Sequence, residues 1–208
     1  MTTVLITNAN IGAGLALAKI YAAKGFEVIA VNARPFAPRD YAQLGYDIRE
    51  LRYDLTKEGA IEDLKTRLGG HPLDLVVLTQ GIALEGPDAD HLTAEAFEDA
   101  MLHATVTPAL LAAALGDNLQ KGADKKLVLL SSVDAAFASP VTPDALAQKA
   151  GYAALHQVLR SLAVEWRPLG ITVAVIAAEG QAAVDCIAAL NLSQTGQFLD
   201  AQGADLAW

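Results

Sequence analysis

The first fifteen residues restrict most strongly what this chain can fold into. A short apolar and β-branched run ends at Thr7, small and turn-forming residues follow, and an amphipathic run begins at Leu15. This succession predicts a buried strand, a tight turn that contains Gly12 and Gly14, and a helix. Glycines in such a turn let the backbone approach a pyrophosphate, and the helix N-terminus offers it free N–H groups. The stretch therefore predicts either a dinucleotide site or a tight turn without a ligand.

Strand and helix patterns alternate along the rest of the chain. Further strands are predicted at Glu27–Val31, Leu51–Asp54, Leu75–Leu78, Leu127–Leu130 and Ile171–Ile176, with a short seventh near Phe198. Helices are predicted at Leu15–Lys24, Ile61–Leu68, Ala94–Leu115 (with a bend near Pro108), Ala145–Trp166 and Ala182–Leu190. Continuous apolar strands are typical of a parallel sheet covered on both faces. Right-handed crossovers then predict an α/β, doubly wound Rossmann-like sheet in three layers, with strand order 3-2-1-4-5-6 plus the seventh.

Composition narrows the class of protein. The chain has 208 residues, of which 53% are hydrophobic, and a net charge of −9, which suits one domain over residues 1–208. We expect no nucleic-acid partner, because no basic patch is visible, and no membrane span, because no apolar run is long enough. Cys186 is the only cysteine, which excludes an intramolecular disulfide. The single cysteine and the lack of a signal-peptide pattern both indicate a cytoplasmic setting. The histidines lack metal-ligand spacing, so no metal site is predicted.

The opening stretch resembles the cofactor turn of the short-chain dehydrogenase/reductase family, Thr-Gly-x-x-x-Gly-x-Gly. Thr7, Gly12 and Gly14 match this motif, and Asn8 replaces its first glycine. Asparagine tolerates a positive φ better than most residues, so we expect the turn to form. The resemblance implies that the turn contacts the cofactor through Asn8, Asn10, Ile11, Gly12 and Gly14.

The resemblance continues at the adenosine end of the expected cofactor site. Arg34 follows the second strand, where NADP-preferring members carry a basic residue, although a solvated loop arginine is an equal alternative. Asp54 and Leu55 occupy the family's adenine-contacting position. The segment from Asp74 resembles the family's Asp-x-Leu-Val-Asn-Asn-Ala-Gly, of which the Asn-Asn-Ala part is lost and Gly81 remains as a cofactor-binding residue.

The family's catalytic positions depart further from the pattern. Ser132 aligns with the catalytic serine, and Tyr152-Ala153-Ala154-Leu155 resembles the family's Lys-Ala-Ala-Leu, so Gln148 and Tyr152 replace the catalytic tyrosine and lysine. An alternative register keeps Lys149 as the lysine and puts Ala145 at the tyrosine. We prefer the first register because the rest of the helix matches it.

Whichever register holds, the predicted helix lacks a Tyr-x-x-x-Lys pair. Ala104 stands where the family has an asparagine that helps to relay protons.

The C-terminal segment indicates a branch of the family. Gly196-Gln197-Phe198-Leu199-Asp200 and Trp208 resemble the ending of the branch that contains C-factor and the sniffer-type carbonyl reductases. Between the sixth strand and this ending the chain is short. Ala178-Glu179 replaces the family's Pro-Gly, and the segment that caps the nicotinamide is missing.

Three functions are consistent with these substitutions. The preferred hypothesis is a family member without oxidoreductase activity that acts as a scaffold or oligomer subunit. The alternatives are an NADP(H)-binding sensor and an active NAD(P)-dependent oxidoreductase with replaced acid–base groups. We expect weak or absent dinucleotide binding, with NADP favoured over NAD if either binds. The resemblance implies a homodimer or tetramer formed through helices Ala94–Leu115 and Ala145–Trp166.

Overall fold

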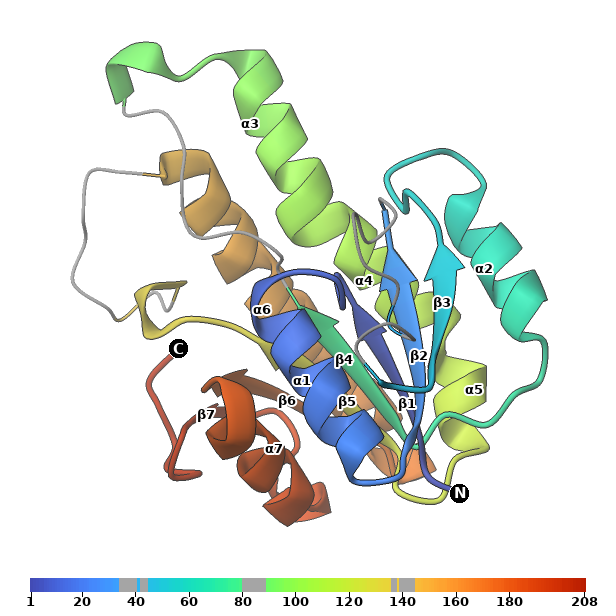
Figure 1. The fold of residues 1–208 in the computed structure, drawn as a ribbon. Coiled ribbons are helices and arrows are strands. Elements are labelled where there is room, and N and C mark those ends of the chain that lie inside the picture. The colour runs from blue at the N-terminus through green and yellow to red at the C-terminus, as the bar shows by residue number, and fades with distance from the viewer. Residues whose placement is uncertain (34–40, 42–44, 80–88, 136–137, 139–144) are drawn as a thin grey trace.

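The chain forms one parallel sheet, described here from a computed structural model that covers residues 1–33, 41, 45–79, 89–135, 138 and 145–208 (Figure 1). The strand order is β3-β2-β1-β4-β5-β6-β7, and every neighbouring pair is parallel. The predicted fold class and strand order are therefore confirmed. The strands are β1 (Thr3–Thr7), β2 (Glu27–Asn32), β3 (Ile48–Arg52), β4 (Leu75–Thr79), β5 (Lys126–Leu130), β6 (Thr172–Ala177) and β7 (Phe198–Asp200).

Side chains alternate between the two faces of the sheet and build a separate core on each. Leu5, Leu78 and Leu129 point to one face, whereas Ile6 and Val77 point to the other. The first core is closed by α2 (Ala60–Leu68), α4 (Thr107–Ala114), α5 (Gly116–Gln120) and α6 (Leu146–Trp166). The second is closed by α1 (Gly12–Ala23) and α7 (Gly180–Ala189), which lie in front of the sheet in Figure 1. This is the three-layer arrangement expected for a parallel sheet whose strands are apolar on both faces.

The long helix predicted over Ala94–Leu115 is divided by a π-helical turn. Helix α3 (Ala94–Met101) passes into the turn η3 (Leu102–Val106), and α4 follows. The Thr105 hydroxyl donates to the Gly151 carbonyl at 2.7 Å, and a Cβ at Gly151 would lie 2.8 Å from the Ala104 Cβ. The expected bend near Pro108 was therefore slightly misplaced, because the irregularity precedes the proline and occurs where η3 packs against α6.

Short 3-10 turns occupy Ala89–His91, Val133–Ala135, Arg167–Leu169 and Leu192–Gln194. In the part of the chain that the structure describes, no helix combines the length and the apolar character required to cross a bilayer.

Candidate functional site

The turn after β1 has the backbone that the sequence pattern requires. Asn8 and Gly12 adopt φ values of +48° and +49°, in the left-handed region. Gly14 lies in the first turn of α1, where a Cβ would come within 2.4 Å of the Asn8 carbonyl oxygen. Only glycine allows α1 to begin so close to the end of β1. Asn10 and Ile11 complete the turn, and Ile11 is the N-cap residue of α1.

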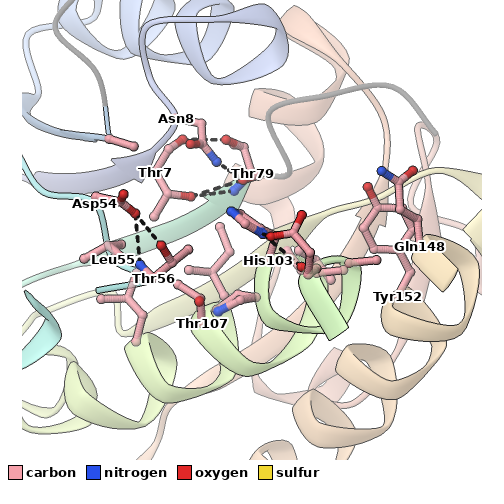
Figure 2. Close-up of a pocket in the computed structure, with 18 of the residues that line it drawn as sticks. Thr7, Asn8, Asp54, Leu55, Thr56, Thr79, His103, Thr107, Gln148 and Tyr152 are labelled. Carbon is pink, nitrogen blue, oxygen red and sulfur yellow. Dashed lines mark hydrogen bonds and ion pairs between the residues drawn. The ribbon is translucent and has the colours of Figure 1, made fainter. Parts of the chain in front are cut away.

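Asn8 also uses its side chain, which the family's glycine could not do. Its Nδ2 donates to the Thr79 carbonyl oxygen at 2.7 Å (Figure 2). The Thr79 N–H donates to the Thr7 hydroxyl at 2.8 Å, and the Thr79 hydroxyl donates to the Thr7 carbonyl oxygen. These bonds fix the carboxyl ends of β1 and β4 to each other, at the edge where doubly wound sheets bind ligands.

A cavity of about 490 Å³ opens at this edge and extends under α3, η3 and α4 toward α6. It is lined by five of the predicted site residues: Asn8, Asp54, Leu55, Gln148 and Tyr152. The predicted residues that do not line it are Asn10, Ile11, Gly12, Gly14 and Ser132. Arg34 and Gly81 lie outside the described residues. The cavity therefore joins the expected adenosine end to the expected catalytic end, and of the predicted turn residues only Asn8 lines it.

Asp54 stands at one end of the cavity, in the turn after β3. Its Oδ1 accepts hydrogen bonds from the Thr56 hydroxyl at 2.6 Å and the Thr56 N–H at 3.2 Å. These bonds, together with Lys57 at 4.0 Å and nearby His103, hold the pKa of Asp54 below its usual value. An ionised carboxylate at this position can accept a hydrogen bond from an amino group such as that of adenine.

Gln148 and Tyr152 stand at the opposite end, on successive turns of α6, and Figure 2 shows them side by side. Tyr152 is only 8% exposed, and burial raises its pKa. Within the described residues its hydroxyl has no hydrogen-bond partner, although it belongs to the cavity wall. Lys149 does not line the cavity, and Ala145 precedes the first residue of α6 with a φ of +51°. Both residues of the preferred register, Gln148 and Tyr152, therefore line the cavity.

Ser132 is exposed and engaged locally. Its Oγ accepts from the Asp134 N–H at 3.2 Å, which is how a serine commonly satisfies the backbone at the end of a strand. The preceding Ser131 is hydrogen bonded instead to Nε2 of the buried His156 at 2.9 Å. Burial lowers the pKa of His156 to about 4, so the ring is neutral at physiological pH.

The sequence did not identify the helical wall of the cavity. That wall comprises Ala96, Asp99, Ala100, His103, Ala104, Thr107, Pro108 and Leu111. Ala96, Ala100 and Ala104 recur every four residues, which would have been the signal for a narrow face on this helix. Asp99 and His103 pair at 3.4 Å at its outer side.

The described residues fit one half of a dinucleotide better than the other. Asp54, Gly14 and the free N–H groups at the start of α1 suit adenosine and phosphate. At the other end lie Gln148 and Tyr152, which the preferred register expects at the positions of the family's catalytic tyrosine and lysine. Within the described ranges, no group of three acidic, histidine or cysteine side chains could hold a metal ion.

Comparisons with known proteins agree with this architecture. FixR from Bradyrhizobium diazoefficiens is 31% identical to this chain over 183 residues. The matched region covers 83% of this chain and 64% of FixR, so the chain spans slightly less than two thirds of that relative. Sniffer, a carbonyl reductase of D. melanogaster, superposes with a TM-score of 0.85 at 21% identity, covering 100% of both chains. A carbonyl reductase from Pseudomonas aeruginosa PAO1, solved in complex with NADP, gives 0.83 at 23% identity, again over 100% of both chains.

The similarity to these solved structures establishes the fold alone, and the family follows from the sequence itself. The family model described as short chain dehydrogenase matches residues 2–190, which is most of the chain. The protein therefore belongs to the short-chain dehydrogenase/reductase family of oxidoreductases.

Proposed function

We propose that this protein is a member of the family that binds an NADP-type dinucleotide weakly and does not reduce carbonyl groups. The observation that carries the proposal is the uncharged pair Gln148 and Tyr152 in the cavity, where the family reaction needs a tyrosine tuned by a lysine. A positioned general acid contributes about 10²–10⁴-fold to such a reaction. A glutamine amide cannot supply that proton at neutral pH.

Tyr152 is a poor substitute for the missing acid. A lysine lowers the pKa of a neighbouring phenol toward the working pH, whereas burial raises the pKa of Tyr152. Ala104 replaces the asparagine of the family relay, and its methyl group packs in a small cluster with Ala135 and Tyr152. The cavity thus provides neither the proton nor a described path for replacing it.

Weak nucleotide binding is the part of the proposal that the adenosine end supports. Asn8, Asp54 and Leu55 line one end of the cavity, and the carbonyl reductase from Pseudomonas aeruginosa was solved in complex with NADP, which supports this part of the proposal. NADP should raise the melting temperature of the protein only at concentrations well above micromolar, and more than NAD does. Purified protein should not consume NADPH with a panel of aldehydes and ketones. Turnover that disappears in Tyr152→Phe would establish an active enzyme and refute the proposal.

A role as a subunit of a homo-oligomer is supported by apolar side chains exposed on the helices of one face. Leu110 on α4 is 56% exposed, Val164 on α6 is 77% exposed, and Val106 lies on the same long helical segment as Leu110. Such side chains are typical of surfaces that associate. We expect light scattering at tens of micromolar to give a dimer or tetramer, and Leu110→Asp with Val164→Asp to dissociate it. A monomeric unmodified protein would refute this assembly.

A further inference from the structure

A second and smaller cavity lies between α6 and the segment that follows β7. Its volume is about 320 Å³, and none of the described residues lines both this cavity and the one at the sheet edge. The described residues that line it are Ala153, His156, Gln157, Arg160 and Trp208. The four residues on α6 are three or four positions apart in turn, so they share one face of the helix. One helix face and one indole ring from a distant segment therefore build this cavity.

Aromatic rings connect the second cavity to the core. The ring of the buried His156 lies 5.3 Å from that of Phe198 and 5.5 Å from that of Trp208, and the last two rings are 5.7 Å apart. These are the usual separations of packed aromatic pairs. His156 is also fixed by the hydrogen bond between its Nε2 and Ser131, and the Trp208 carbonyl oxygen accepts from the Ala138 N–H at 3.0 Å. The two rings that line the cavity are thus held in place and present flat surfaces to it.

Arg160 brings a positive charge to this cavity without a carboxylate partner. Its guanidinium carbon lies 5.0 Å from the centre of the Trp208 ring, and Nη1 donates to Gln157 Oε1 at 3.5 Å. Within the described ranges, no acidic side chain forms an ion pair with it. The His156 ring is neutral at physiological pH, so Arg160 is the one charged side chain among the described residues that line this cavity. A guanidinium stacked on an indole still has in-plane N–H groups that can bind a carboxylate by two hydrogen bonds.

We propose that this second cavity binds a flat aromatic carboxylate. The ring of the ligand packs against Trp208 and the neutral His156, and its carboxylate accepts hydrogen bonds from the Arg160 guanidinium. The net charge of the chain is −9, so the attraction for an anion comes from these local contacts and not from the overall charge. This binding goes beyond the proposed function and does not depend on it, because the two cavities are lined by different residues.

The test is a fluorine NMR titration of the full chain with 4-fluorobenzoate and, in parallel, with the uncharged 4-fluorobenzamide. We expect saturable binding of the benzoate and roughly tenfold weaker binding of the benzamide, because only the carboxylate pairs with Arg160. Arg160→Gln should weaken the benzoate roughly tenfold and leave the benzamide unchanged, since it removes the charge-assisted hydrogen bonds. The matched control is Arg167→Gln, which changes the net charge equally at an exposed position after α6 and should affect neither ligand.

A further variant tests the aromatic wall. Trp208→Ala removes the ring against which both ligands pack, so it should weaken benzoate and benzamide alike, roughly three- to tenfold. Circular dichroism verifies that each variant folds, and light scattering verifies that its mass equals that of the unmodified protein.

Three results would overturn this inference: no saturable binding of the benzoate, equal affinity for the benzoate and the benzamide, or equal benzoate affinity in Arg160→Gln and the unmodified protein. Displacement of the benzoate by NADP would place it in the cavity at the sheet edge and would overturn the inference as well. An NADP-dependent melting shift on the same samples tests the nucleotide proposal separately, so either proposal can fail without the other.

Discussion

Replacing Asp74 by asparagine should destabilise the fold without touching the cavity. Asp74 precedes β4 at the opposite edge of the sheet and is buried. One carboxylate oxygen accepts from the Thr3 N–H at 2.8 Å, and the other from the N–H groups of Ala123 at 2.6 Å and Asp124 at 3.3 Å. An asparagine amide has one oxygen, so at least one of these N–H groups would face an NH₂ donor. Each buried donor left unsatisfied costs about 1–3 kcal/mol, so we expect a loss of about 2–4 kcal/mol.

The pH dependence of this effect gives an independent test. Burial alone would raise the pKa of Asp74, but the three backbone N–H groups outweigh it and lower the pKa. A lowered pKa in the folded state stabilises the protein above the ordinary carboxyl pKa of about 4, and this stabilisation is lost as the pH falls through the folded value. The difference between Asp74→Asn and the unmodified protein should therefore be constant above about pH 5 and shrink in more acidic buffers.

Urea unfolding from pH 3 to pH 7 measures both quantities. The exposed Asp205 provides the control, because Asp205→Asn should change stability by less than about 0.5 kcal/mol. At neutral pH the loss in Asp74→Asn corresponds to a melting temperature lower by roughly 5–10 °C in a chain of this length. Equal stability of Asp74→Asn and the unmodified protein, or a difference that does not vary with pH, would refute the reasoning.

Three further predictions concern the site. Gly14→Ala should lower the free energy of unfolding by about 2 kcal/mol or more, because the new Cβ would lie 2.4 Å from a backbone oxygen. The new Cβ of Gly12→Ala meets no atom within 4 Å, so this variant should lose only about 1 kcal/mol, from strain at its positive φ. Equal losses in the two variants would contradict this reasoning. Burial lowers the pKa of His156 to about 4, so stability should fall as the pH decreases from about 6.5 toward 4, and His156→Gln should flatten that slope in urea unfolding. Gln148→Tyr with Tyr152→Lys should restore little NADPH oxidation, because the resemblance implies that the segment that caps the nicotinamide is missing; rapid turnover would contradict that interpretation.

The sheet could be predicted because its strands are short apolar runs whose alternate residues face two cores. The weakest prediction was β3, expected at Leu51–Asp54 and observed at Ile48–Arg52. This strand lies at the edge of the sheet, so its polar residues Arg49 and Glu50 remain partly accessible, and a search for apolar residues starts too late. Local pattern is informative where a strand is covered on both faces and less so at the edge.

The position of this helical wall against α6 could not be predicted, because packing between distant segments determines it. The π turn at Leu102–Val106 is accompanied by the Thr105 hydroxyl bond to Gly151, forty-six residues away, which no local pattern encodes. This contact brings η3 against α6 and places Ala104 beside Tyr152. The resemblance implied that Ala104 and Tyr152 replace family residues, but only the structure shows that they share one apolar cluster.

The positions that match the family pattern and those that depart from it meet different physical requirements. Gly12 and Gly14, which match the pattern, meet requirements of backbone geometry. Asn8 departs from it, yet it takes the required positive φ and adds a hydrogen bond to β4. Gln148 and Tyr152, by contrast, correspond in the preferred register to the family's acid–base pair, and both line the cavity. Under the proposed function, these substitutions remove the means of proton transfer, while the turn, the sheet edge and a cavity remain. A chain altered in this way can still bind a ligand, which is why binding experiments test its function more directly than a search for carbonyl substrates.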